Sequence, residues 1–204
     1  MTHKFAKYLI LAAGALSLSA LPALATTCGG DLIVTSGTTC TLGALSFDFD
    51  TVSFDPAASA DSLELTTGTG ISGDDYTLDF QVTPDGATDL LLEYTVTSLA
   101  PVITGVDNSY LSNGSSPADQ SLDEEVCTNS TCDDELMVLD NTTGGLQYSS
   151  PFAAQSSIFI EKDFAFPSSF FTDSVVATPE PSSIGFMLIG ALGIALVSRK
   201  FRRA

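Results

Sequence analysis

The sequence predicts an all-β protein, an antiparallel β-sandwich, and two observations lead to this prediction. Apolar and polar side chains alternate in residues 76–83 and 90–97, with the period of a strand that buries one face. Elsewhere, short apolar runs are separated by turns rich in Gly, Pro, Asn and Ser, without any amphipathic helix pattern of useful length in the body. Roughly eight short strands of this kind favour a sandwich, with a β-barrel or a short β-solenoid as the alternative.

The two alternating stretches are the clearest elements. They flank Thr83-Pro84-Asp85-Gly86-Ala87, where Pro presets φ and Gly accepts a positive φ, so we expect the stretches to pair as an antiparallel hairpin. The apolar run at 32–34, followed by Ser36-Gly37, indicates a further strand and turn. Weaker strands are expected at residues 45–54, 62–66, 102–106, 136–140, 156–163 and 170–176.

Charge is distributed very unevenly along the 204 residues. Six of the seven basic residues lie near the two ends, whereas residues 26–178 hold 24 of the 25 acidic residues and one cation, Lys162. This body repels nucleic acid and anionic lipid, so neither is an expected partner. We interpret the acidity as a means of staying soluble in an oxidising exterior, with divalent-cation binding or spacing within a polymer matrix as the alternative.

Residues 1–25 have the parts of a secretory signal peptide. A polar start with two lysines precedes the apolar run 9–20, and Ala23-Leu24-Ala25 is a small-residue cleavage site. We expect an N-terminal signal helix that engages the Sec export machinery and is cut by signal peptidase after Ala25. The alternative is an N-terminal helix that is not cleaved. Cleavage would place the mature body, from Thr26, outside the cytoplasm and would remove His3, the chain's single histidine.

The four cysteines fit an exported protein with two disulfides. Four cysteines allow three pairings, and we predict the local one, Cys28 with Cys40 and Cys127 with Cys132. Closing each short loop would restrict the unfolded chain and so stabilise the fold by about 2–3 kcal/mol in the entropic model. A four-cysteine zinc site is the alternative, but the spacings lack the tight pairs of a zinc ribbon and no histidine is near.

A long polar stretch, residues 108–134, is expected to be a loop because it lacks a strand pattern. Two acidic triplets, which the second cysteine pair would bring near each other, lie in it or at its end, and hard carboxylate oxygens suit Ca²⁺. The candidate metal ligands are Asp123, Glu124, Glu125, Asp133, Asp134 and Glu135. The spacing is not that of an EF-hand, and a solvated charged loop without any cofactor is the preferred interpretation.

The body offers little for catalysis. Without histidine, neither a Ser-His-Asp nor a Cys-His apparatus can be built, and oxidised cysteines are not nucleophiles. Lys162, between Glu161 and Asp163, is interpreted as local charge neutralisation in an exposed pair rather than as a catalytic lysine. A carboxylate pair of the glycosidase kind remains the weakest alternative, because the body has neither Trp nor Arg. We therefore predict a protein that is not an enzyme.

The end of the chain combines three features in order. Pro179-Glu180-Pro181 is followed by an uncharged apolar run, Ile184 to Val197, and then by a basic cluster. Such a cluster stays on the cytoplasmic side of a bilayer. Its four basic residues are Arg199, Lys200, Arg202 and Arg203. The uncharged run has 14 residues and is short for a span, so the expected transmembrane helix is extended to 183–198.

This tail, residues 178–204, resembles the PEP-CTERM sorting signal of Gram-negative bacteria. Thr178 departs mildly from the family, which more often has Val before the first Pro. The resemblance implies that an exosortase, a membrane-embedded enzyme, recognises the tail and removes it. Members of this family are exported surface proteins, often of species that make exopolysaccharide. An ordinary uncleaved anchor is the alternative.

Together these observations predict three parts: a signal peptide at 1–25, an acidic sandwich at 26–177 and a sorting signal at 178–204. The expected function is that of a non-enzymatic protein, held transiently in the inner membrane with its body in the periplasm. It would then be delivered to the cell surface or to the extracellular matrix of a biofilm. The alternative function is binding of Ca²⁺ or of a matrix polysaccharide by the cysteine-stapled acidic loop, residues 123–135.

Overall fold

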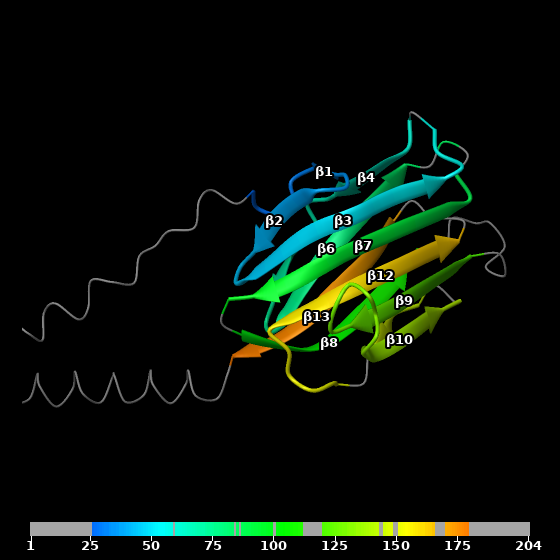
Figure 1. The fold of residues 1–204 in the computed structure, drawn as a ribbon. Helices are drawn as coiled ribbons and strands as arrows, with labels where there is room; N and C mark the ends of the chain where they lie inside the picture. Colours follow the sequence, from blue (N-terminus) through cyan, green and yellow to red (C-terminus); the bar gives the residue numbers. More distant parts are fainter. Residues whose placement is uncertain are drawn as a thin grey trace, which may run out of the picture.

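The computed structural model describes residues 26–179, except residues 59, 84, 86, 100, 112–119, 143–144, 149–150 and 166–169. Within these residues the chain forms thirteen β-strands in two antiparallel sheets that face each other (Figure 1). The prediction of an all-β antiparallel sandwich is thus confirmed. The expected signal helix and transmembrane helix lie outside the described residues, and no helix within them could span a membrane.

The six-stranded sheet is built from long strands at its centre and shorter ones at its edges. Its strand order is β10-β9-β12-β7-β3-β2. The bounds, in chain order, are β2 Thr38–Leu42, β3 Leu45–Asp55, β7 Asp89–Ser98, β9 Ser121–Cys127, β10 Glu135–Asn141 and β12 Ser157–Ala165.

The seven-stranded sheet has the order β1-β4-β6-β13-β8-β11, with β5 pairing β6 outside this path. The bounds are β1 Leu32–Val34, β4 Ser62–Leu65, β5 Gly70–Ser72, β6 Asp75–Thr83, β8 Pro101–Tyr110, β11 Gln147–Tyr148 and β13 Phe170–Pro179. Consecutive strands therefore often lie in opposite sheets, as β12 and β13 do.

The two strongly alternating stretches form strands as expected, but they do not pair with each other. Leu90, Leu92, Tyr94 and Val96 of β7 are all buried, and the alternation of β6 likewise predicts its inward face. However, β6 lies in the seven-stranded sheet and β7 in the six-stranded sheet. The predicted hairpin is therefore wrong. Both strands bury their apolar faces in one core by facing each other across it, so the turn between them crosses from one sheet to the other.

The long polar loop expected at residues 108–134 is also wrong. Strand β8 continues to Tyr110, and a seven-residue strand, β9, begins at Ser121. In β9, Leu122, Glu124 and Val126 are buried while Asp123 is exposed. The alternation is present in the sequence, but a glutamate occupies the middle inward position, so hydrophobicity alone does not reveal the strand.

Both predicted disulfides are present. Cys28–Cys40 ties the segment before β1 to strand β2, and Cys127–Cys132 closes the turn between β9 and β10. Their Cα atoms are 5.0 and 5.1 Å apart, within the ordinary range for a disulfide. These bonds are consistent with an exported, non-cytoplasmic protein, because thiols in the cytosol are kept reduced.

Candidate functional site

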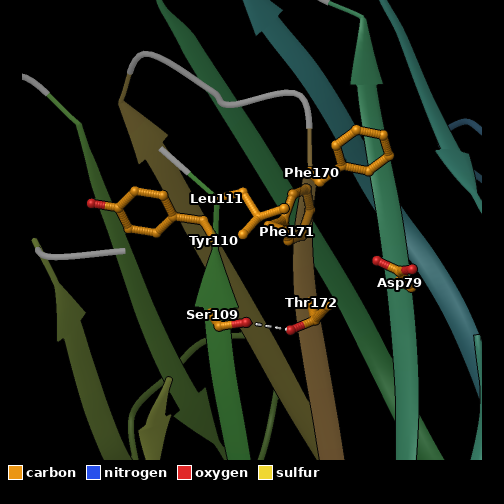
Figure 2. Close-up of a pocket in the computed structure, with 7 residues that line it drawn as sticks. All are labelled: Asp79, Ser109, Tyr110, Leu111, Phe170, Phe171 and Thr172. Carbon is orange, nitrogen blue, oxygen red and sulfur yellow. Dashed lines mark hydrogen bonds between the residues drawn. The ribbon is translucent and has the colours of Figure 1, made fainter. Parts of the chain in front are cut away.

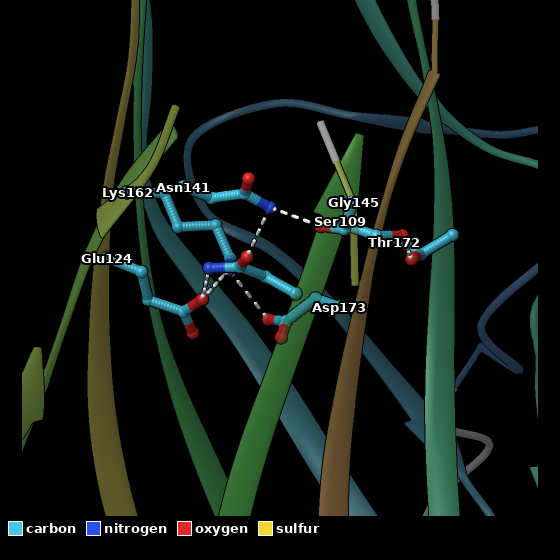
Figure 3. Close-up of polar contacts among 8 residues, drawn as sticks. Ser109, Glu124, Asn141, Gly145, Lys162, Thr172 and Asp173 are labelled. Carbon is cyan, nitrogen blue, oxygen red and sulfur yellow. Dashed lines mark hydrogen bonds and ion pairs between the residues drawn. The ribbon is translucent and has the colours of Figure 1, made fainter. Parts of the chain in front are cut away.

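Lys162 lies in the core between the two sheets, not on the surface, so its interpretation as part of an exposed charge pair is wrong. Its side chain is 1% exposed, and Nζ lies 2.6 Å from Oε2 of Glu124 and 3.4 Å from Oδ2 of Asp173. Figure 3 shows the amine between these two carboxyl groups. Glu124 is the residue opposite Lys162 on the neighbouring strand β9, whereas Asp173 reaches it from β13 of the opposite sheet.

Two buried asparagines complete this buried polar cluster of Asn108, Glu124, Asn141, Lys162 and Asp173. Asn108, opposite Asp173 on strand β8, donates a hydrogen bond of 2.6 Å from Nδ2 to Oε2 of Glu124. Asn141 in turn donates from Nδ2 to Oδ1 of Asn108 at 3.1 Å, and to the carbonyl oxygen of Gly145 at 2.7 Å. The two amides therefore fix the position of Glu124 beside the amine.

Apolar layers cover the cluster on both sides, along the strands. Two positions away from each cluster residue on β8, β9, β12 and β13, the inward residue is an apolar or aromatic side chain that is at most 2% exposed. One layer consists of Tyr110, Leu122, Phe164 and Phe171, and the other of Val106, Val126, Ile160 and Val175. The ring centroids of Phe164 and Phe171 are 5.7 Å apart and join the two sheets. The cluster therefore lies in a water-poor environment.

The environment shifts the proton affinities of the cluster in opposite directions. Burial lowers the pKa of the Lys162 amine, and the nearby Glu124 carboxylate partly opposes this effect. Burial raises the pKa of Asp173 well above its usual value, against a smaller opposing effect of a hydrogen bond from the Ser174 backbone. Within the described chain, neither oxygen of Asp173 makes a well-aligned hydrogen bond with a partner. The arrangement thus favours a neutral carboxylic acid beside an amine.

The sequence carried a signal for this site that its local charges concealed. In β12, Ile158, Ile160 and Phe164 are buried, and Lys162 occupies the same alternating phase. The acidic neighbours Glu161 and Asp163 lie on the opposite face of the strand. The alternation of side chains along the strand places Lys162 on the inner face, whereas the acids next to it in the sequence suggested an exposed charge pair.

The six candidate metal ligands are spread over three environments. Glu124 points into the core, Asp123 and Glu125 lie on the outer face of β9, and the second triplet occupies the turn after Cys132 and the start of β10. In that turn Thr131 donates from Oγ1 to Asp133 at 2.6 Å.

A metal site requires several ligand atoms within reach of one ion. Among the described residues, the group of three acidic or cysteine ligand atoms that all lie within 4.8 Å of one another belongs to Glu125, Cys127 and Cys132. Both sulfurs of this group are in the disulfide and unavailable as thiolate ligands. The structure therefore does not gather the six acids into one calcium site.

On the outer face of the six-stranded sheet, acidic residues lie opposite acidic residues. Asp123 lies opposite both Asp140 and Asp163, and Glu161 lies opposite both Glu93 and Glu125. We call these six residues the outer acidic face. The pKa of Asp163 is raised to about 6, chiefly by partial burial and to a smaller extent by a hydrogen bond with Asp89 and repulsion from it. Partial burial and neighbouring acids also raise the pKa of Asp123 and Glu161.

A cavity of about 250 Å³ opens at one end of the seven-stranded sheet (Figure 2). Its described lining is mostly apolar, with Leu111 and Phe170 exposed at 65% and 37%. Its polar groups are Asp79 and the hydroxyls of Ser109 and Thr172, which are 2.6 Å apart. An aromatic ring beside hydroxyl and carboxylate groups is suited to an organic ligand with both apolar and polar faces.

The predicted processing residues fall at or beyond the ends of the described chain. Pro179 is the last residue of β13 and lies opposite Pro101 of β8. Glu180 and Pro181, the cleavage residues Ala23 and Ala25, and the basic cluster from Arg199 to Arg203 lie outside the described residues.

Comparison with models of protein families gives no match, and comparison with curated proteins gives none. Among solved structures, the chain is similar to one reported as a carbohydrate-binding module of the β-sandwich superfamily, with 14% sequence identity and a TM-score of 0.33. The similarity covers 75% of this chain and 62% of that structure, so the chain spans less than two thirds of its length.

Proposed function

We propose that this protein is a non-enzymatic exported protein of the cell surface or extracellular matrix, sorted by a PEP-CTERM signal that an exosortase recognises and cleaves. The observation that carries the proposal is the ordered tail of Pro179-Glu180-Pro181, apolar run and basic end. Two features support it: the disulfides suit an oxidising compartment, and the folded strand β13 ends at the first residue of the motif.

The proposed topology follows from the order of these parts. The folded body would lie in the periplasm, held to the inner membrane by residues 183–198, with the basic end in the cytoplasm. Since β13 runs directly into the motif, the exosortase would act close to the end of the sandwich. The body would then be released without its anchor.

The test is to express the full chain with and without an exosortase and to measure the mass of the mature protein. We expect loss of the tail only when the enzyme is present, and the replacements Pro179→Ala and Glu180→Ala should each reduce that loss. Pro101→Ala is the matched control for Pro179→Ala, because Pro101 lies opposite Pro179 in the sheet but outside the motif. A mature protein that retains residues 184–204 in both strains would refute the proposal.

Polysaccharide binding is the second candidate function. The cavity beside Phe170 is a better candidate site for it than the acidic residues 123–135. The partly exposed ring of Phe170 offers a sugar a stacking surface, and Asp79, Ser109 and Thr172 offer it polar partners. Affinity electrophoresis in gels that contain the host's own exopolysaccharide would test it. We expect Phe170→Ala to abolish retardation and Ile33→Ala, an exposed apolar residue on β1, to leave it unchanged. Equal mobility with and without polysaccharide would exclude this function.

A further inference from the structure

The buried polar cluster contains the reactants of an amide bond. Lys162 supplies a primary amine, and Asp173 supplies a carboxyl group whose Oδ2 lies 3.4 Å from it. Both side chains are 1% exposed, and apolar layers lie above and below them. A buried ionised amine beside two buried acids is expensive to maintain, because desolvation disfavours each charge. An amide between the two groups is neutral, so the nitrogen of Lys162 would no longer carry a buried charge.

We propose that Lys162 and Asp173 form an intramolecular amide bond that covalently joins the two sheets, with Glu124 as the group that transfers the proton. Lys162 lies on β12 of the six-stranded sheet, and Asp173 lies on β13 of the seven-stranded sheet. The bond would make the folded body a self-crosslinked unit, an activity beyond its proposed export and sorting.

The reaction is a condensation with water as the second product. The Nζ lone pair of the neutral amine attacks Cγ of the protonated Asp173 carboxyl group, and a C–N bond forms. The Glu124 carboxylate, 2.6 Å from Nζ, accepts a proton from the nitrogen and delivers it to the departing hydroxyl of Asp173. The C–O bond then breaks and one water molecule leaves. Nothing is oxidised or reduced, and Glu124 returns to its initial state.

Three features of the site favour this reaction over a simple ion pair. The fold holds the amine and carboxyl group together, and well-oriented intramolecular reactions reach effective molarities of about 10⁵–10⁸ M. Burial favours the neutral forms of Lys162 and Asp173, which are the reactive ones. The hydrogen bond from Asn108 holds Glu124 in place. Glu124 therefore serves as the base and is not the carboxyl group that the amine attacks.

Trypsin provides a direct test, because Lys162 is the one Lys or Arg between Lys7 and Arg199. The full chain is recovered from cells, unfolded, reduced, alkylated and digested. If Lys162 is acylated, trypsin cannot cut after it and the body stays in one piece. Lys162→Arg is the matched control: it keeps the acidic neighbours Glu161 and Asp163, cannot form the amide, and should be cut. A synthetic peptide of residues 156–166 calibrates the cleavage rate of the free lysine.

Digestion at glutamate then locates the bond. Cleavage after Glu161, together with cleavage after Glu180 or the processed end of the chain, gives a peptide that contains both partners. We expect its mass to be lower by one water molecule, and its fragment spectrum to lack backbone ions between Lys162 and Asp173. Glu124→Gln preserves size and removes the base, so the trypsin-resistant fraction should fall while the β-sheet circular dichroism is retained.

Complete cleavage of the wild-type body after Lys162 would overturn the proposal. Three other causes of trypsin resistance would also overturn it, because each assigns the lysine to another partner. These are an amide bond to Asn108 with loss of ammonia, an amide bond to Glu124 with loss of water, and a separate group attached to the amine. None of these results depends on exosortase processing, which removes residues from the tail and leaves this site untouched.

Discussion

Lys162 shows how the environment of one side chain decides its chemistry. The same residue, flanked by two acids in sequence, would form a weak screened pair on a surface. Inside the sandwich it has two different acidic partners, Glu124 and Asp173, and little water. Removing one member of such a buried cluster leaves the others without compensation, which is far more destabilising than losing a surface pair.

We therefore expect Lys162→Met to lower the free energy of unfolding by about 3–5 kcal/mol, because Glu124 loses its buried polar partner, the nitrogen of Lys162. Urea denaturation followed by circular dichroism measures the change. Glu161→Met is the control: it is the preceding residue of β12, on the outer face beside other acids, and should cost nothing or stabilise. A loss below about 1 kcal/mol for Lys162→Met would contradict the electrostatic role of this lysine.

Asp163 leads to a pH-dependent prediction of the opposite sign to that of a salt-bridged acid. Its pKa is raised from 3.8 to about 6 in the folded protein, so protonation favours the fold. This contribution is complete below about pH 3.8 and is lost as the pH rises through about 6. We expect Asp163→Asn to stabilise the protein at pH 7 by up to about 1 kcal/mol, the usual range for like charges on neighbouring strands.

Thermal unfolding of wild type and Asp163→Asn at pH 4 and at pH 7 measures this effect. The difference should shrink or vanish at pH 4. Asp48→Asn is the control, because Asp48 is exposed on β3 opposite Thr39 and Thr95 rather than opposite acids. If Asp163→Asn were only as stable as wild type at pH 7, or if the stability difference between them grew toward pH 4, repulsion on the outer acidic face would be contradicted.

At the scale of elements, connections matter more than the strands themselves. Strands β6 and β7 follow each other in the chain but lie in opposite sheets, and so do β12 and β13. In each pair, the second strand lies on the opposite side of the same core. The disulfides act on local elements instead: one fixes the start of the body to β2, and the other closes the β9–β10 turn.

The two disulfides should contribute unequally. The Cys28–Cys40 loop spans 12 positions and the Cys127–Cys132 loop spans five, so the entropic model gives about 3 and about 2 kcal/mol respectively. Paired Cys→Ser variants of each bond, unfolded in guanidinium chloride, would measure these losses. A larger loss for the Cys127–Cys132 pair would show that the turn geometry, rather than loop length, determines its contribution.

At the scale of the whole molecule, residues 26–178 carry 24 acidic residues against one cation, and that cation is buried. The outside is therefore almost uniformly negative. Such a charge keeps molecules apart and favours solubility, but self-repulsion weakens the compact state. It also makes the protein sensitive to ionic strength, because salt screens charges separated by more than about 8 Å near physiological concentration.

We expect added salt to stabilise the body by about 1 kcal/mol, which corresponds to a rise of about 2–4 °C in Tm for a domain of this size. Sodium chloride and calcium chloride at equal ionic strength should have the same effect, since the candidate calcium ligands are dispersed. A rise specific to calcium would point instead to a cation site. Differential scanning calorimetry at both salts distinguishes the two outcomes.

Local patterns in the sequence were sufficient for several features. Alternation in β6 and β7 predicted both strands and their buried faces, and short cysteine spacing predicted the disulfide partners. The acidic composition and the ordered tail are likewise properties of the sequence itself, and they carry the proposal of export and sorting.

Only the tertiary structure decided which strands are neighbours and what meets inside. Strand pairing depends on how two faces share one core, so β6 and β7 lie in opposite sheets although their turn suits a hairpin. Lys162, Glu124 and Asp173 are far from obvious partners, because Glu124 lies 38 positions from Lys162 and in a stretch that resembled a loop. Local residue patterns determine which face of a strand is buried; the packing of distant strands determines which side chains that burial brings together.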